Sequence, residues 1–160
     1  MIKTEKKIQP LNLLLEEVEK WKNAGDDIVF TNGCFDIIHL GHIDYLQKAR
    51  NLGSKMIVGV NSDDSVKRLK GATRPIVNEY ARQRMMASFE FVDAVVLFDE
   101  DTPLPLIQNI LPHILVKGND YTIENIVGAD IVIENGGRVE TISLVEGYST
   151  SNIIKLIKEI

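Results

Sequence analysis

Two histidines with a glycine between them stand where a strand is expected to give way to a helix. His39 and His42 flank Gly41, a few residues after the apolar run 28–30. Imidazoles are hydrogen-bond donors of tunable charge, and glycine lets another group approach the backbone closely. The free N–H groups at the start of a helix favour an anion. Together these features predict a phosphate-binding site.

The alternative is that the two histidines are a helix cap and a surface residue. The chain holds only three histidines, and two of them fall at this one junction, which favours the phosphate site. The segment offers no matching third ligand, so a metal site is not expected there.

The elements around this junction alternate between short apolar runs and amphipathic segments. This pattern predicts an α/β fold, a single-domain, Rossmann-like, doubly wound parallel sheet in three layers, α/β/α. The predicted strands are residues 28–30, 55–60, 94–98, 114–116 and 139–144. The predicted helices are residues 10–24 and 43–51, one capped by 61–64 with Val66 and Leu69 facing inward, and then 79–91, 103–109 and 151–160.

The segment 123–135 fits two structures. Asn135-Gly136 could form a hairpin turn, or Gly136-Gly137 could end a helix. We favour the helix because the rest of the chain alternates. In a sheet of this kind, ligands bind beyond the carboxyl ends of the strands, near a switch in strand order. Functional residues are therefore expected directly after strands.

The bulk composition limits the function classes. The chain has 160 residues and a formal net charge of −5, which argues against a general nucleic-acid surface. Its one cysteine, Cys34, excludes an intrachain disulfide. No apolar run approaches the roughly 20 residues of a membrane helix, and no apolar segment of a secretory signal follows the N-terminus. We expect a cytoplasmic protein without nucleic-acid or membrane partners.

The segment from Gly33 to His42 resembles the HxGH motif of the cytidylyltransferase-like nucleotidyltransferase superfamily. The resemblance extends over nearly the whole chain after residue 26. In detail, the chain is similar to the adenylyltransferases of D-glycero-D-manno-heptose 1-phosphate. The segments that carry the detailed similarity are 60–71, 74–76, 116–121 and 146–151. The resemblance implies an N-terminal helical extension, residues 1–25, and a nucleotidyltransferase domain, residues 26–160.

The implied reaction transfers AMP from ATP to a sugar 1-phosphate and releases pyrophosphate. Magnesium is expected with ATP, and a homodimer is implied by resemblance alone. Alternatives within the superfamily are cytidylyl transfer to glycerol 3-phosphate or another alcohol phosphate, and adenylyl transfer to FMN. Cytidylyltransferases of alcohol phosphates carry an arginine and a threonine where this chain has Leu144 and Val145, which weakens the CTP alternative. Outside enzymes, the alternative is an inactive nucleotide-binding module.

The resemblance also implies roles for individual residues. The expected catalytic residues, at the α-phosphate and the charge of the triphosphate, are His39, His42 and Lys70. The expected nucleotide-binding residues are Gly33, Cys34, Phe35, Gly41, Arg82, Ser149 and Thr150. The candidates for the acceptor side or for magnesium contacts are Asp36, Lys117 and Asp120.

Some of these residues have plainer alternatives as surface or capping groups. Lys70 could belong to a solvated basic helix face with Lys67 and Arg68. Ser149 and Thr150 could serve only as a helix cap.

Others could be purely structural. Asp36 could lie in an Asx turn, and Lys117 could have no contact with a ligand. Arg82 or its neighbour Arg84 could be a surface ion-pair partner. The acid that usually precedes this arginine in the family is Ala81 here, so the pairing of Arg82 is open.

Overall fold

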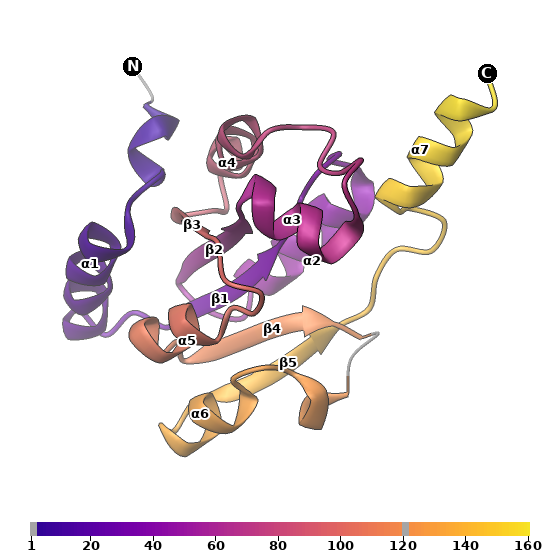
Figure 1. The fold of residues 1–160 in the computed structure, drawn as a ribbon. Coiled ribbons are helices and arrows are strands. Elements are labelled where there is room, and N and C mark those ends of the chain that lie inside the picture. Colours follow the sequence, from indigo (N-terminus) through magenta and orange to yellow (C-terminus); the bar gives the residue numbers. More distant parts are fainter. Residues whose placement is uncertain (1–2, 120–121) are drawn as a thin grey trace.

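A computed structural model describes residues 3–119 and 122–160, and these form a five-stranded parallel sheet with helices on both faces (Figure 1). The strand order is β3-β2-β1-β4-β5. The strands are β1 (Ile28–Gly33), β2 (Lys55–Asn61), β3 (Ala94–Phe98), β4 (Ile114–Gly118) and β5 (Arg138–Ile142). The α-helices are α1 (Leu11–Asn23), α2 (Leu40–Arg50), α3 (Asp63–Lys70), α4 (Glu79–Ser88), α5 (Leu104–Ile110), α6 (Ala129–Glu134) and α7 (Thr150–Lys158). Two short 3-10 helices are η1 (Thr4–Lys7) and η2 (Ile123–Asn125).

The three layers follow from the alternation of side chains along the strands. Phe30 faces the core formed with α1, α5 and α6, whereas its neighbour Val29 faces the core formed with α2 and α4. Both side chains are fully buried. Strands that are buried on both faces read as continuous apolar runs, and this is why the sequence pattern predicted the doubly wound sheet correctly.

The N-terminal segment is part of the same core. Leu14 and Val18 of α1 are buried against the sheet. Ahead of α1, Ile8 forms a parallel bridge with Val95 of the edge strand β3. The segment therefore covers backbone groups that an edge strand would otherwise expose.

The strand order switches at β1, which lies between β2 and β4. Six residue pairs join β1 to β2, but only Val29–Ile114 and Phe30–Leu115 join β1 to β4. Beyond them the two strands are bridged by the hydroxyl of Tyr45, which lies 2.7 Å from Thr31 Oγ1 and donates to the carbonyl of Val116 at 3.0 Å. The sheet therefore opens at its carboxyl edge between β1 and β4.

Several element ends differ from the sequence prediction by two or three residues, and three differences concern the site or its surroundings. The first strand continues to Gly33 because residues 31–33 still pair with β2. Leu69, expected to face inward, is half exposed because it lies near the end of α3, at the rim of a cleft. The segment 123–135 is neither a hairpin nor one helix. It forms η2 and α6, which are separated at Gly128, where φ is +81°.

The last helix differs from the others in its packing. No residue of α7 is buried, and the helix projects from the body of the molecule (Figure 1). Only its first turn lies near the carboxyl edge of the sheet, where Thr150 Oγ1 donates to the carbonyl of Ile37 at 3.4 Å. Within the described part of the chain, no helix is both long and apolar enough to cross a membrane.

Candidate active site

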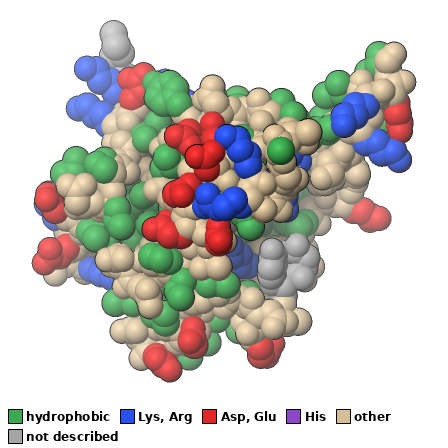
Figure 2. All heavy atoms as spheres, in the orientation of Figure 1, with side chains coloured by type: hydrophobic (Ala, Val, Ile, Leu, Met, Phe, Trp, Pro, Cys, Tyr) green, Lys and Arg blue, Asp and Glu red, His purple; other side chains and the backbone are tan. Residues whose placement is uncertain are grey.

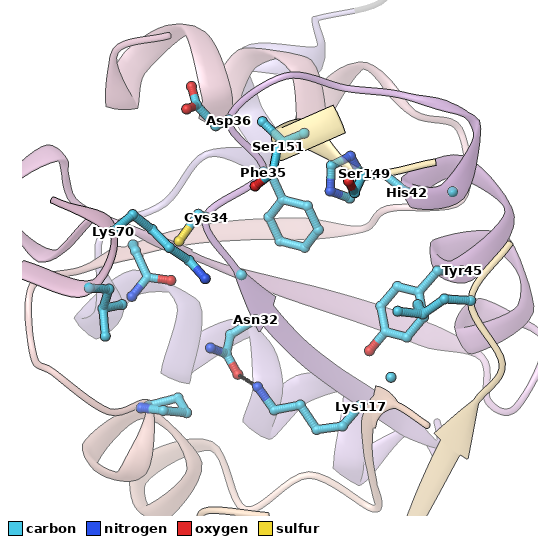
Figure 3. A pocket seen from close by; sticks show the side chains of 18 of the residues that line it. Asn32, Cys34, Phe35, Asp36, His42, Tyr45, Lys70, Lys117, Ser149 and Ser151 are labelled. Carbon is cyan, nitrogen blue, oxygen red and sulfur yellow. Dashed lines mark hydrogen bonds between the residues drawn. The ribbon is translucent and has the colours of Figure 1, made fainter. Parts of the chain in front are cut away.

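A cleft of about 560 Å³ lies at the carboxyl edge of the sheet, over the opening between β1 and β4 (Figure 3). This volume lies in the range of small-molecule sites. The predicted site residues that line the cleft are Gly33, Cys34, Phe35, Asp36, His39, Gly41, His42, Lys70, Lys117, Ser149 and Thr150. Arg82 does not line it, and Asp120 lies outside the described residues.

The two histidines form a stacked pair at the start of α2. Their ring centroids lie 3.8 Å apart with an angle of 22° between the planes. Phe35 packs edge-on against His42 with centroids 5.5 Å apart. The Nδ1 atoms of His39 and His42 are buried and have no hydrogen-bond partner in the described part of the chain. Buried polar groups in proteins are usually paired, so the two rings retain capacity to bind a ligand.

Both imidazoles are neutral at physiological pH. Burial and, to a smaller extent, the nearby His39 lower the pKa of His42 to about 4. Burial also lowers the pKa of His39. A neutral imidazole has one N–H donor and one acceptor nitrogen. The pair can therefore donate hydrogen bonds to an anion without the cost of two adjacent positive charges.

The loop between β1 and α2 is held close to these rings. A Cβ atom at Gly41 would lie 3.1 Å from the His39 ring, and one at Gly33 would lie 3.0 Å from the Phe35 ring. Phe35 itself has a φ of +47°, in the left-handed region that non-glycine residues seldom adopt. Such strain persists only where surrounding contacts enforce it, as at functional sites.

Two helix starts face the cleft. His39 is the N-cap residue of α2, and its side chain makes no capping hydrogen bond. Ser149 is the N-cap residue of α7, where its Oγ accepts from the Asn152 N–H at 3.1 Å. Ser149 therefore caps α7, and this capping is compatible with a ligand at the same helix start. Each start carries partial positive charge that favours a phosphate.

The three cations at the end of α3 have different environments. Lys67 pairs with Asp64 at 2.8 Å and Arg68 with Asp101 at 2.7 Å. Figure 2 shows this surface over α3, where acidic and basic side chains are mixed. Lys70 lines the cleft and has no ion-pair or hydrogen-bond partner among residues 3–119 and 122–160. Lys67 and Arg68 thus form a paired basic face, whereas Lys70, which is also exposed, lines the cleft.

Arg82, expected among the nucleotide-binding residues, does not line the cleft, because its side chain is fully buried. Its guanidinium donates to the carbonyl of Cys34 at 2.6 Å and to the carbonyl of Val77 at 2.9 Å, and it pairs with Asp63 at 2.9 Å. Arg82 thus supports the loop between β1 and α2 (residues 34–39) from behind, and we call this segment the phosphate loop. Asp63 supplies the acid that is missing at position 81.

Asp36 is also not positioned as a contact to an acceptor or to magnesium. Its carboxylate is 1% exposed and accepts from Arg74 Nε at 2.6 Å, from the Ile76 N–H at 2.8 Å and from the Val77 N–H at 2.8 Å. Burial raises its pKa, but the hydrogen bonds from Val77, Ile76 and Arg74 lower it further, and the net direction is down. An Asx turn is excluded because the partners lie about 40 residues away in the chain.

Lys117 spans the floor of the cleft. Its Nζ donates to Oδ1 of Asn32 across the opening between β4 and β1 (Figure 3). No role was predicted for Asn32 or for four other residues that line the cleft, namely Tyr45, Asn61, Arg74 and Tyr148. Asn32 and Asn61 could have been found, because each is a polar residue at the carboxyl end of an apolar strand.

Several known proteins are similar to this chain in sequence. A family model described as Cytidylyltransferase-like matches residues 30–156. The bifunctional protein HldE of Geotalea uraniireducens (strain Rf4) is 53% identical over 152 residues, which cover 95% of this chain and 31% of that protein. HldE of Methylobacillus flagellatus is 50% identical over 149 residues, which cover 93% of this chain and 30% of that protein. The chain thus spans about a third of the length of these relatives.

Solved structures share the fold. The lipopolysaccharide core biosynthesis protein from Thermoplasma volcanium GSS1 superposes with a TM-score of 0.61 and 29% identity, over 78% of this chain and all of that one. The pantoate-beta-alanine ligase of Francisella tularensis, at 15% identity and a TM-score of 0.53, covers 91% of this chain and 76% of its own and shares the fold alone. The family match includes the histidine pair, Lys70 and the start of α7. The chain belongs to the cytidylyltransferase-like family.

Proposed function

We propose that this protein transfers AMP from ATP to a sugar 1-phosphate of the D-glycero-D-manno-heptose class and releases pyrophosphate. The observation that carries the proposal is the stacked, neutral pair of His39 and His42, whose Nδ1 atoms have no hydrogen-bond partner among the described residues. The pair lies at the start of α2, in the same cleft as Lys70 and the start of α7. These groups are suited to a chain of phosphates.

The choice of nucleotide and acceptor is supported by sequence. The four segments that resemble heptose 1-phosphate adenylyltransferases lie within the region that is about 50% identical to HldE proteins. Leu144 and Val145 replace the arginine and threonine of cytidylyltransferases that act on alcohol phosphates. Leu144 lines the cleft, so the departure lies at the site.

In the proposed reaction, a phosphate oxygen of the sugar phosphate attacks the α-phosphorus of ATP. One P–O bond forms, the bond from the α-phosphorus to the bridging oxygen of the β-phosphate breaks, and pyrophosphate leaves with that electron pair. Such a step requires alignment and stabilisation of charge rather than a covalent intermediate on the protein. Cys34 is not needed as a nucleophile, and burial raises the pKa of its thiol.

Each group in the cleft has a role in this scheme. The N–H donors of His39 and His42 bind the α-phosphate and the charge that develops on it. The start of α7, with Ser149 and Thr150, holds the β- and γ-phosphates. Lys70 neutralises the triphosphate from the opposite side, where it has no acidic partner within the described residues.

Magnesium enters this scheme as part of the ATP complex. Residues 3–119 and 122–160 contain no cluster of His, Cys, Asp or Glu that could hold a metal ion. The carboxylates that line the cleft, Asp36 and Asp101, are paired with Arg74 and Arg68. This donor set fits Mg²⁺ bound through phosphate oxygens and water, with few protein ligands. A homodimer and a cytoplasmic location are part of the same proposal, and sedimentation of the purified protein tests the first.

The test is pyrophosphate release with ATP, CTP, GTP and UTP, each against heptose 1-phosphates, glycerol 3-phosphate and FMN. Release with ATP and a heptose 1-phosphate alone is the expected result, and it identifies the anomer. Release with CTP and an alcohol phosphate would keep the chemistry but overturn the substrate. No release from folded protein with magnesium present would contradict the proposal and favour the inactive nucleotide-binding module.

A further inference from the structure

Among the described residues, Arg74 is the one arginine that lines the cleft. It has no role in the reaction scheme proposed for this protein. It lies in the loop between α3 and α4, four residues after Lys70. Its side chain is 14% exposed, and its Nε donates to Asp36 Oδ2 at 2.6 Å. Arg74 is therefore largely buried beside the phosphate loop rather than free on the surface.

The hydrogen bond to Asp36 fixes the direction of this side chain. Asp36 also accepts from the backbone N–H groups of Ile76 and Val77, so the carboxylate and the loop are held together. The bond to Asp36 uses Nε of Arg74, and the two Nη groups have no hydrogen-bond partner among residues 3–119 and 122–160. A guanidinium whose Nη pair is available presents a planar fork that matches two phosphate oxygens.

The local charge favours an anion at this position. Burial raises the pKa of the Cys34 thiol, and the positive charges of Lys70, Arg82 and Arg74 act on it in the opposite direction. Two carboxylates, Asp36 and Asp63, pair with the two arginines. Lys70 has no acidic partner within the described residues, so its charge is available to an anion.

The geometry of the proposed attack sets the side of the cleft on which the acceptor must lie. In an in-line displacement the attacking oxygen and the leaving pyrophosphate lie on opposite sides of the α-phosphorus. Figure 3 shows Lys70 and Cys34 on one side of Phe35, and His42 and Ser149 on the other. If the pyrophosphate lies toward Ser149 at the start of α7, the acceptor approaches from the side of Lys70 and its loop.

We propose that Arg74 binds the phosphate of the acceptor through its two Nη groups, with Asp36 as the residue that orients it. This inference rests on the proposed function, because it needs a phosphorylated acceptor. It specifies that the acceptor is a phosphomonoester whose phosphate lies between the loop 71–78 and the α-phosphate of ATP. The positive fork also offsets the repulsion between the acceptor phosphate and the triphosphate, which must approach each other closely.

The test compares Arg74→Lys with the wild type in steady-state kinetics with ATP and the phosphorylated acceptor. Lysine keeps the charge and can still pair with Asp36, but it cannot also present a planar fork. We expect KM for the acceptor to rise roughly 10- to 100-fold, the range for losing hydrogen bonds to a charged group. KM for ATP should change by less than about threefold. The matched control is Arg68→Lys, whose arginine is exposed and pairs with Asp99 and Asp101; neither KM should change.

A second measurement separates binding from catalysis. Calorimetric titration of heptose 1-phosphate into protein saturated with magnesium and α,β-methylene-ATP gives the acceptor Kd directly. Tighter binding to the wild type than to Arg74→Lys, with equal affinity for the analogue and equal Tm, supports the inference. A rise in KM for ATP alone, equal acceptor affinities, or a change in Tm alone would overturn it. A wild type that neither turns over nor binds any phosphorylated acceptor would instead refute the proposed function.

Discussion

The two walls of the cleft are built in opposite ways. On one wall, Asp36 and Arg82 are buried, and seven hydrogen bonds of their side chains join the phosphate loop, the loop 71–78, α4 and the start of α3. On the other wall, α7 has no buried residue. Within the described residues, its side chains are joined to the rest of the molecule by the hydrogen bond from Thr150 to the carbonyl of Ile37. The first wall is preorganised, as charge stabilisation in a transition state requires. The second can adapt to the end of a triphosphate.

The largest expected effect is on the preorganised wall. Asp36→Ala leaves the guanidinium of Arg74 and the N–H groups of Ile76 and Val77 without a partner. Removing one member of a buried pair costs about 3–5 kcal/mol, so the free energy of unfolding should fall by about that amount in urea denaturation. The control is Asp64→Ala, which removes an exposed pair with Lys67 and should lower the free energy of unfolding much less, because exposed ion pairs contribute little. An equal fall in the free energy of unfolding in the two variants would show that the buried Asp36 contributes no more to stability than an exposed carboxylate.

The next effect concerns the histidine pair between the walls. His42→Ala removes one preorganised donor, and kcat should fall by about 10²- to 10³-fold. The Tm should stay near that of the wild type, because the ring has an unused polar atom and makes no buried hydrogen bond through Nδ1. Turnover that stays at the wild-type level would remove His42 from the site.

The neutral state of His42 makes a prediction about acid stability. The pKa in the folded state is about 4, against about 6.5 in the unfolded chain. Between these values the unfolded chain binds a proton that the folded protein does not, so the free energy of unfolding falls as the pH falls from about 6.5 to 4. Because the ring is partly exposed, we expect a loss of about 2 kcal/mol rather than the full value of the shift.

This loss should be smaller in His42→Gln, which has no titrating group at the position. Urea unfolding of both proteins at pH 7 and pH 4.5 measures it. Parallel losses in the two proteins would mean that His42 is not the group responsible.

The smallest expected effect is on the adaptable wall. Ser149→Ala removes the cap of α7 and should destabilise that helix by about 1 kcal/mol. Because α7 contributes no buried residue, global unfolding in urea should change little, whereas KM for ATP should rise several-fold. The matched control is Ser62→Ala, which removes the cap of α3 and should affect global stability instead. The opposite pattern would show that α7 is as firmly attached as α3.

The sequence predicted the scaffold and the cleft, but not the roles of the buried charges. Runs such as 28–30 consist of consecutive apolar residues, which predict a strand that is buried on both faces of the sheet. His39 is the N-cap residue of α2, so local pattern was enough to predict its position. The roles of Lys70, the last residue of α3, and of Ser149 were instead expected from the family resemblance. Arg82 and Asp36 could not be placed in this way. Their partners lie up to 48 residues away, and their burial follows from the packing of α4 against the loop.

The length of α7 gives its exposed position a further meaning. A helix of nine residues is too short to be stable alone in water, and here it receives little support from the body of the molecule. Under the proposed function, a triphosphate bound at its first turn would supply that support, and part of the free energy of nucleotide binding would go into holding the helix. Affinity for ATP would then be coupled to helix stability. Substitutions in the last turn, far from any phosphate, can tune that affinity by changing helix propensity alone.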